Sequence, residues 1–237
     1  MYDLSIVIPA YNEEKKISND IEAIISFFEI NEIAGQLIIV DDGSKDKTKD
    51  VSEKYAQDHK FIKVIAYKTN KGKGYALRKG MLEANGEIIL FADAGLCVPF
   101  DLAFRGIELI KKGYDIALGS RRNKASKIQI KQPFYRQLGA KAFMFLIKLF
   151  GVIPQGVEDT QCGFKLFKKD VAHDIYKRCV IDKFMIDLEM LRIATKSKYK
   201  IASFPVEWSN DPDTRYDPFI GTVQNLLQIL KILIRNY

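Results

Sequence analysis

The chain has 237 residues, of which 47% are hydrophobic and 28% charged, and this balance excludes a disordered protein. Its length fits one large α/β domain, or two small ones sharing a core. Lysine and arginine outnumber aspartate and glutamate by 37 to 30, so the net charge is +7 and anionic partners are favoured. Charge alone does not choose between nucleic acid, phosphorylated small molecules and an acidic membrane surface.

The cysteines and the N-terminus indicate in which cellular compartment the protein acts. Cys97, Cys162 and Cys179 are widely spaced, which indicates neither a disulfide framework nor a zinc site and suits a reducing compartment. The N-terminus lacks the basic stretch of a signal peptide and enters a strand almost at once. No apolar run approaches the roughly 18–20 residues that span a bilayer, and Lys148 interrupts the longest one. We therefore expect a protein that does not cross a membrane by itself.

In the first half of the chain, short apolar runs alternate with stretches of helical periodicity. The sequence predicts a helix that opens at Tyr11, with Asn12 as its N-cap and two glutamates in its first turn. Five strands are predicted, over residues 4–8, 37–40, 61–66, 88–91 and 114–118. Helices are predicted between them, over residues 11–28, 46–57, 76–82 and 100–112. This alternation indicates right-handed βαβ units and a mostly parallel sheet.

The second half of the chain changes character. Residues 133–150 form a predicted helix with apolar side chains on much of its circumference, and residues 218–235 form a final, very apolar helix. The other predicted elements are strands over 164–167 and 201–208 and helices over 170–178 and 183–195. No repeat, low-complexity tract or linker divides the chain. Residues 1–237 are therefore predicted to form a single α/β domain.

Acidic residues follow several of the predicted strands. Asp41 and Asp42 follow the second strand, Asp93 follows the fourth, and Asp159 lies further along the chain. Ligands of open α/β sheets bind beyond the carboxyl ends of the strands. Carboxylates gathered there indicate a hydroxyl-rich ligand, a divalent cation, or both. The alternative for Asp93 is that it caps the helix beginning near Pro99.

Basic residues lie in complementary loops. Lys71 and Lys73 alternate with glycines, Arg121 and Arg122 follow the fifth strand, and Arg136 lies in the predicted helix over 133–150. The alternatives are an ordinary solvated turn for the lysines, whose loop matches no standard phosphate-binding pattern, and a surface pair for the two neighbouring arginines. The basic residues are dispersed and lack an aromatic-basic platform, which argues against a nucleic-acid partner.

Six short motifs occur in order along the chain: Pro9-Ala10-Tyr11-Asn12-Glu13, Asp41-Asp42-Gly43-Ser44, Asn70-Lys71-Gly72-Lys73-Gly74, Asp93-Ala94, Gly119-Ser120-Arg121 and Asp159-Thr160-Gln161-Cys162-Gly163-Phe164-Lys165. Together they resemble the family 2 inverting glycosyltransferases with a GT-A fold. The chain is most similar to the dolichyl-phosphate β-glucosyltransferases and their polyprenyl-phosphate relatives. The resemblance implies a Rossmann-like, mostly parallel sheet flanked by helices, with amphipathic helices in the C-terminal half. Residues 1–122 would bind the nucleotide sugar, and residues 123–237 would form the acceptor side.

The resemblance implies a role for each matched residue around the nucleotide sugar. The base and ribose would contact Pro9, Ala10, Tyr11, Glu13 and Asp42. Lys73 and Ala94 would complete this donor site, and Asp93 would face the ribose and the metal-bound diphosphate.

The reacting groups would be handled by three further residues. Arg121 and Arg136 would face the donor diphosphate or the acceptor phosphate, since guanidinium groups suit phosphate oxygens. Asp159 matches the acidic residue that serves the family as catalytic base or as organiser of the acceptor. A phosphate monoester has a second pKa of about 6 and is largely ionised near neutrality, so Asp159 would only orient it. A sugar hydroxyl would need Asp159 as its base. Either attack, opposite the leaving diphosphate, inverts the anomeric centre.

The chain departs from the family pattern at one position. Members read Asp-Ala-Asp, whereas this chain reads Asp93-Ala94-Gly95, so the carboxylate that normally binds the metal directly is missing. We expect a divalent cation, Mg²⁺ or Mn²⁺, to be held weakly by Asp93, the diphosphate and water. Two alternatives stay open: arginines neutralise the leaving group, or the protein is a catalytically weak nucleotide-sugar binder.

The predicted reaction is transfer of a hexose, glucose from UDP-glucose, to a polyprenyl or dolichyl phosphate. The alternative acceptor is a glycan or another hydroxyl compound. The predicted helices over 133–150 and 218–235 have the composition of interfacial helices, which favours a peripheral location at the cytoplasmic face of a membrane. The alternative is that both helices are buried against the sheet.

Overall fold

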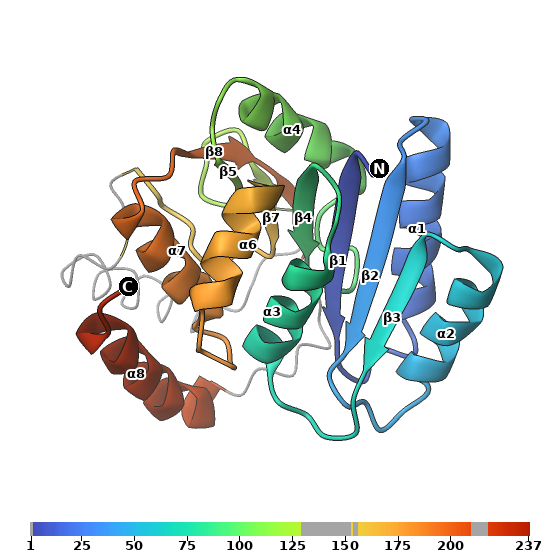
Figure 1. The fold of residues 1–237 in the computed structure, drawn as a ribbon, viewed down its shortest axis with the longest axis horizontal. Coiled ribbons are helices and arrows are strands. Elements are labelled where there is room, and N and C mark those ends of the chain that lie inside the picture. Colours follow the sequence, from blue (N-terminus) through green and yellow to red (C-terminus); the bar gives the residue numbers. More distant parts are fainter. Residues whose placement is uncertain (1, 129–152, 154–155, 210–217) are drawn as a thin grey trace.

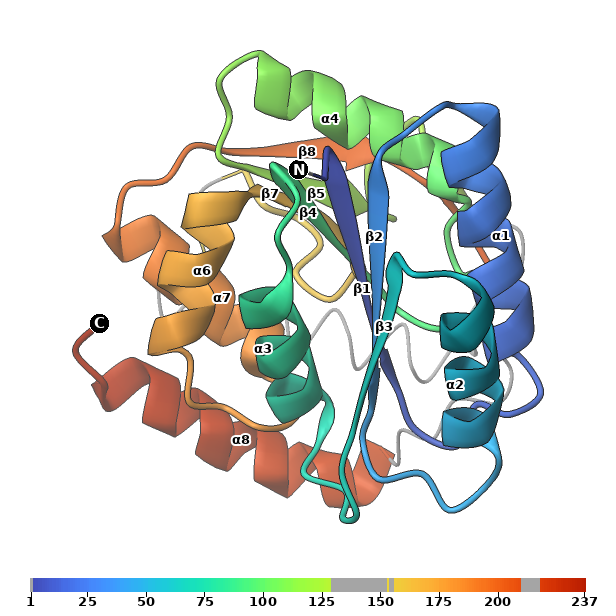
Figure 2. The same cartoon turned by 45° about the vertical axis from the view of Figure 1, so that its right-hand side comes forward.

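The computed structural model describes residues 2–128, 153, 156–209 and 218–237. A seven-stranded sheet, in the order β3-β2-β1-β4-β7-β5-β8, runs through the molecule with helices on both faces (Figures 1 and 2). Its strands are β1 (Leu4–Ala10), β2 (Gly35–Asp41), β3 (Ile62–Ala66), β4 (Ile88–Ala92), β5 (Ile116–Ser120), β7 (Phe164–Lys168) and β8 (Ile201–Pro205). β7 is antiparallel to β4 and β5, and the other neighbours are parallel. The predicted mostly parallel sheet is confirmed.

The helices divide between the two faces of the sheet. On one face lie α1 (Ile17–Ile30), α2 (Thr48–Asp58), the 3₁₀ helix η1 (Phe100–Leu102) and α4 (Ala103–Lys111). On the other lie α3 (Lys73–Glu83), α6 (Lys169–Arg178) and α7 (Ile186–Lys196). The last helix, α8 (Pro218–Ile234), packs on α7. Within the described residues, no helix combines the length and apolarity needed to span a bilayer.

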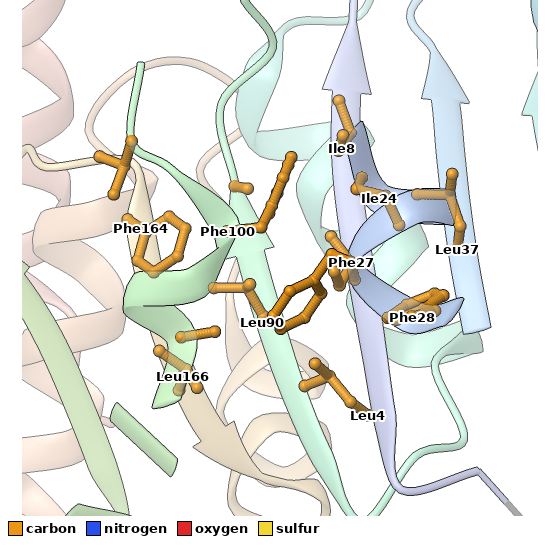
Figure 3. Close-up of a cluster of buried hydrophobic side chains, with 14 of the residues drawn as sticks. Leu4, Ile8, Ile24, Phe27, Phe28, Leu37, Leu90, Phe100, Phe164 and Leu166 are labelled. Atoms are coloured by element: carbon orange, nitrogen blue, oxygen red, sulfur yellow. The ribbon is translucent and has the colours of Figure 1, made fainter. Parts of the chain in front are cut away.

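Alternation along the central strands creates two cores. In β1, Leu4 and Ile8 point toward α1, whereas Val7 points toward α3. Figure 3 shows the first of these cores, in which Phe27 of α1 lies near Leu90 of β4. Full burial of each such side chain stabilises the fold by about 1.5–3 kcal/mol. The sheet is therefore a rigid support for the loops at its edges.

The first helix starts later than the sequence predicts. α1 begins at Ile17, and Asn12 is not its N-cap but has a left-handed backbone with φ 54°. The reason is that the preceding segment bonds to the loop after β2: the N–H of Asn12 donates to Ser44 Oγ (2.8 Å), and the N–H of Lys45 donates to Asn12 Oδ1 (2.7 Å). These long-range hydrogen bonds compete with the first helical turn.

Of the other predicted elements, one differs from the structure and one lies outside the described residues. The strand predicted over 201–208 is wrong as a single element, because it divides into β8 and a short β9 (Glu207–Trp208) that pairs with β6 (Lys127–Ile128) in a second sheet. Val206 stands between them and points into the core. The predicted helix over 133–150, with Arg136, lies outside the described residues.

Candidate active site

The fold brings several chain segments to one edge of the sheet. β2 ends at Asp41 and is followed by Asp42, and β4 is followed by Asp93. Because β7 is antiparallel to β4, its first residue, Phe164, lies at this same edge. The N–H of Asp93 donates to the carbonyl oxygen of Gly163 at 2.9 Å. The antiparallel strand thus places the 159–163 segment beside the ends of the parallel strands.

Arg121, just after β5, binds Asp159 through two parallel hydrogen bonds. Arg121 Nε donates to Asp159 Oδ2 and Nη2 donates to Oδ1, both at 2.7 Å, and the backbone N–H of Arg121 adds a third bond at 2.9 Å. The side chain of Asp159 is only 3% exposed. Burial acts to raise the pKa of the Asp159 carboxyl, but the hydrogen bonds and charge of Arg121 outweigh it and hold this pKa below its ordinary value. Asp159 is therefore an ionised carboxylate and a poor base at neutral pH.

Asp93 is paired with Lys73, the first residue of α3. Lys73 Nζ lies 2.7 Å from Asp93 Oδ1. Asp93 also packs closely on Gly163, where an added Cβ would lie 1.8 Å from Asp93 Oδ2. Capping of the next helix by Asp93 is wrong, because η1 is preceded by Pro99 as its N-cap residue. An ordinary solvated turn is also wrong for the lysine loop, since Lys73 makes this ion pair and the neighbouring glycines are buried.

A third ion pair lies beneath the site. Lys165 of β7 is fully buried, and its Nζ donates to Asp187 Oδ1 of α7 at 2.5 Å and to the carbonyl oxygen of Cys162 at 2.6 Å. The bond to Cys162 ties the 159–163 segment to α7. The structure therefore matches each of the carboxylates Asp93, Asp159 and Asp187 with a cation.

Asp42 is surrounded by donors from one loop. Its carboxylate accepts hydrogen bonds from Tyr67 Oη, Asn70 Nδ2 and the backbone N–H groups of Lys71 and Gly72, at 2.7–2.8 Å. These bonds fix the loop that leads into α3. A direct contact between Asp42 and the donor base or ribose stays a prediction.

The other residues predicted for the donor site lie around this edge. Pro9 and Ala10 end β1, and Tyr11 and Glu13 are partly buried in the segment that follows. Ala94, next to Asp93, is also partly buried. Their contacts with a nucleotide stay predictions.

Asp20 also lies at this edge, although it belongs to none of the six sequence motifs. It is a fully buried residue of α1, and its carboxylate accepts hydrogen bonds from the N–H groups of Gly95 and Leu96 at 2.8–3.0 Å. One signal in the sequence is that Asp20 falls at helical spacing between the apolar residues Ile17 and Ile24. Asp20 fixes the loop that carries Asp93.

Replacing Asp20 by asparagine is expected to change how stability depends on pH. Burial raises the pKa of the Asp20 carboxyl from 3.8 to about 6, although the two N–H donors oppose the shift. Since the folded state holds this proton more tightly, Asp20 stabilises it most below pH 3.8, and this contribution is lost as the pH rises through about 6. The difference in unfolding free energy between wild type and D20N should therefore fall by up to about 3 kcal/mol from acid to neutral pH.

Urea denaturation at several pH values would measure this difference. D58N, at an exposed aspartate at the end of α2, is the control and should follow the wild-type curve. Parallel stability curves for wild type and D20N would contradict the prediction.

Few ligands for a metal ion gather at this edge. Among the residues that the structure describes, no group of three or more histidine, cysteine, aspartate or glutamate side chains could hold an ion. Lys73 occupies one oxygen of Asp93, backbone N–H groups occupy Asp20, and Gly95 has no side chain. The described residues therefore do not fit a divalent cation bound directly by several protein ligands. Weak retention of a cation stays a prediction.

A cavity of about 580 Å³ lies against the segment that precedes Asp159 and against the loop between α7 and β8. Its lining includes Ser120, Asn123, Glu158, Lys198, Tyr199 and Ser203. Ser120 and Glu158 are the chain neighbours of Arg121 and Asp159, whereas Asp93 and Lys73 do not line it. The cavity therefore touches the chain neighbours of the Arg121–Asp159 pair, but neither residue of the pair is among those that line it.

The family model described as Glycosyl transferase family 2 matches residues 5–176. The chain belongs to this family. Dolichyl-phosphate beta-glucosyltransferase of Homo sapiens is 33% identical over 249 residues, covering 98% of the chain and 75% of that protein. The enzyme of the same name from Dictyostelium discoideum is 32% identical over 247 residues, covering 98% and 74%. These relatives identify this family 2 member as a hexosyltransferase.

Solved structures confirm the GT-A fold of this glycosyltransferase. Glucosyl-3-phosphoglycerate synthase from Mycobacterium tuberculosis, in complex with UDP, superposes with a TM-score of 0.69 at 17% identity, covering 98% of this chain and 79% of that one. A mannosyltransferase from Pyrobaculum calidifontis, in complex with GDP-Man and Mn²⁺, gives a TM-score of 0.65 at 18% identity, covering 100% and 65%. At these identities the likeness shows the fold alone.

Proposed function

We propose that this glycosyltransferase moves glucose from UDP-glucose to a polyprenyl or dolichyl phosphate, with inversion at the anomeric carbon. Relatives named for glucose and dolichyl phosphate support the sugar and the acceptor. Fold neighbours solved with UDP and with UDP-glucose support the donor. Cys97, Cys162 and Cys179 form no disulfide in the described structure, which suits a site of action on the cytoplasmic face.

The protonation state of Asp159 is the observation on which we base the choice of acceptor. Its carboxylate is buried, held at both oxygens by Arg121, and has a lowered pKa. A general base works best when its pKa lies near the working pH, and the lowered pKa of Asp159 does not satisfy this condition. A phosphate monoester arrives already ionised and requires no base. An acceptor phosphate is therefore the nucleophile that this site can use.

The chemical step follows from these groups. An oxygen of the acceptor phosphate forms a bond to C1 of glucose while the bond from C1 to the β-phosphate oxygen breaks, and its electron pair leaves with UDP. Arg121 uses Nε and one Nη2 donor on Asp159, so its other guanidinium donors can bind a phosphate oxygen. Asp159 thereby positions the guanidinium group of Arg121 beside the reacting phosphates. Arg136 would supply a second guanidinium group there.

Solvent partition of labelled product tests this proposal. The purified protein would be given radiolabelled UDP-glucose and a short polyprenyl phosphate, and label should move into the organic phase. Omission of the acceptor is the control. Label that stays in the aqueous phase at every acceptor concentration would contradict the proposal. A parallel thermal-shift screen of UDP- and GDP-sugars would test the donor.

The cavity lined by Glu158 and Ser120 favours a second candidate acceptor, a glycan or another hydroxyl compound. Its serine, asparagine and tyrosine side chains would suit hydroxyl groups. With such an acceptor Asp159 would have to act as the base. Label appearing in a water-soluble glycan would support this reading over the lipid phosphate.

The last helix supports a peripheral membrane contact next to the site. Ile229 and Ile232 on its buried face pack with Ile181. The carbonyl oxygen of Ile181 lies close to Gly74, 2.4 Å from the position that a Cβ would take there, and Gly74 is next to Lys73 in the chain. Figures 1 and 2 show α8 at the end of the molecule toward which β1 points. The opposite face of α8 exposes Leu226, Leu227, Leu230 and Ile234 at 47%, 62%, 55% and 83%. The helix contains no acidic residue, and its Lys231 is exposed. This composition suits an anionic lipid surface.

The double variant L227S/L230S is expected to lose at least about tenfold in binding to vesicles of anionic phospholipid, since each buried leucine contributes about 1.5–3 kcal/mol. Co-sedimentation would measure it. I30S, at an 80% exposed isoleucine at the end of α1, is the matched control and should bind as wild type does. Equal binding by L227S/L230S and wild type would exclude this face of α8 from the contact.

A further inference from the structure

The loop after β4 differs from a metal-binding loop in two ways. Gly95 offers no carboxylate, and its backbone has φ 94°, a conformation that other residues rarely adopt. The nearby acid, Asp20, directs its oxygens at the N–H groups of this same loop. A fold neighbour, by contrast, was solved with Mn²⁺ and UDP-glucose. The positive charge that a diphosphate requires has to come from another group.

Lys73 stands where such a charge would act. Its Nζ lies 2.7 Å from Asp93 Oδ1, and the side chain is 20% exposed. An ammonium group has three N–H donors, so it can hold Asp93 and still donate to a ligand oxygen. Burial acts to lower the pKa of the Lys73 ammonium, but the carboxylate of Asp93 outweighs it, and the net shift is upward. The group is therefore cationic at neutral pH.

The position of Lys73 is fixed by its neighbours. A Cβ added at Gly72 would lie 2.3 Å from the carbonyl oxygen of Asp182, and one at Gly74 would lie 2.4 Å from that of Ile181. Only glycines allow the lysine loop to approach the 181–183 segment so closely. Lys73 also begins α3, whose N-terminus adds a partial positive charge. The tight packing fixes the place of Lys73, and its ammonium and the helix N-terminus both favour an anion there.

We propose that Lys73 bridges Asp93 and the donor diphosphate, and that its ammonium supplies the counter-charge to the diphosphate in place of a divalent cation bound directly by the protein. The inference rests on the proposed function, because it assumes a nucleoside-diphosphate donor. It makes UDP binding largely independent of a divalent cation. A cation held by the diphosphate and water would add to this binding but would not be required for it.

Calorimetric titration with UDP, in EDTA and in Mn²⁺, tests the inference. The wild type should bind UDP in EDTA with an affinity within about threefold of that in Mn²⁺. K73M should weaken binding in EDTA by about 10–100-fold, the loss expected for one hydrogen bond to a charged group. K73R should retain part of the affinity. K71M is the matched control, because Lys71 lies in the same loop but over the Tyr75 ring, 4.4 Å from its centroid. Melting temperatures would establish that each variant is folded.

The possible failures are distinguishable. UDP binding by the wild type only in Mn²⁺, or equal affinities for K73M and K71M, would overturn the role of Lys73 and leave the proposed function standing. Absence of UDP and GDP binding to the wild type in both buffers would overturn the proposed function, and this inference with it.

Discussion

Replacing Lys165 by methionine is expected to lower the free energy of unfolding by about 3–5 kcal/mol, because it leaves a buried carboxylate without its cation. The side chains of Lys165 and Asp187 are 0% and 2% exposed, and their charged atoms lie 2.5 Å apart. Lys165 Nζ lies 5.4 Å from the centroid of the Phe91 ring and binds the carbonyl of Cys162. Because both side chains are buried, water cannot replace the charge and the hydrogen bonds of the Lys165 ammonium group.

Urea denaturation would measure this change, and two further variants make it specific. The double variant K165M/D187L removes both charges and should be more stable than K165M by about 2 kcal/mol, since a buried pair can be replaced by apolar groups at little cost. K168M is the control on the same strand. Lys168 pairs with Asp115 at 2.8 Å, but its side chain is 41% exposed, so its loss should cost less than about 1 kcal/mol. A double variant as unstable as K165M would contradict the explanation.

Much of the fold follows from patterns that the sequence displays openly. The continuous apolar runs of β1, β2 and β4 are typical of buried parallel strands, and the acids at their ends mark the edge where the site forms. The antiparallel insertion of β7 between β4 and β5 is different. Strand order depends on contacts across the whole sheet, and no local pattern shows it. Yet this insertion brings Asp159 to the same edge as Asp93.

The partners of the acidic residues were not predictable in the same way. The sequence marks Asp93 and Asp159 as site residues, but it does not show that Lys73 and Arg121 pair with them. Asp187 and Glu189 illustrate the limit. Two residues apart on a helix, they cannot share a face, yet both are buried: Asp187 binds Lys165, and Glu189 accepts hydrogen bonds from the N–H groups at 180–181. Partners this distant in the chain are set by tertiary packing, not by spacing.

The largest effect on activity is expected from separating Arg121 and Asp159. D159N keeps the shape of the side chain but removes the charge that holds Arg121 through three hydrogen bonds. If the pair acts as a unit, D159N and R121M should each lower turnover by at least about 100-fold. The double variant should be little worse than either, because effects within a unit are not additive.

Steady-state kinetics on the lipid phosphate would measure this cycle, with E158Q as a control at the exposed neighbouring acid. The acceptor then separates the two roles of Asp159. If Asp159 only orients the acceptor, its ionisation should not appear in the pH profile of kcat near neutrality, because its lowered pKa keeps it charged there. As a base for a hydroxyl acceptor it would make D159N far more damaging with that acceptor than with a phosphate. Additive losses in R121M and D159N would show that the two residues act separately, and the positioning of Arg121 by Asp159 would then not be the basis of catalysis.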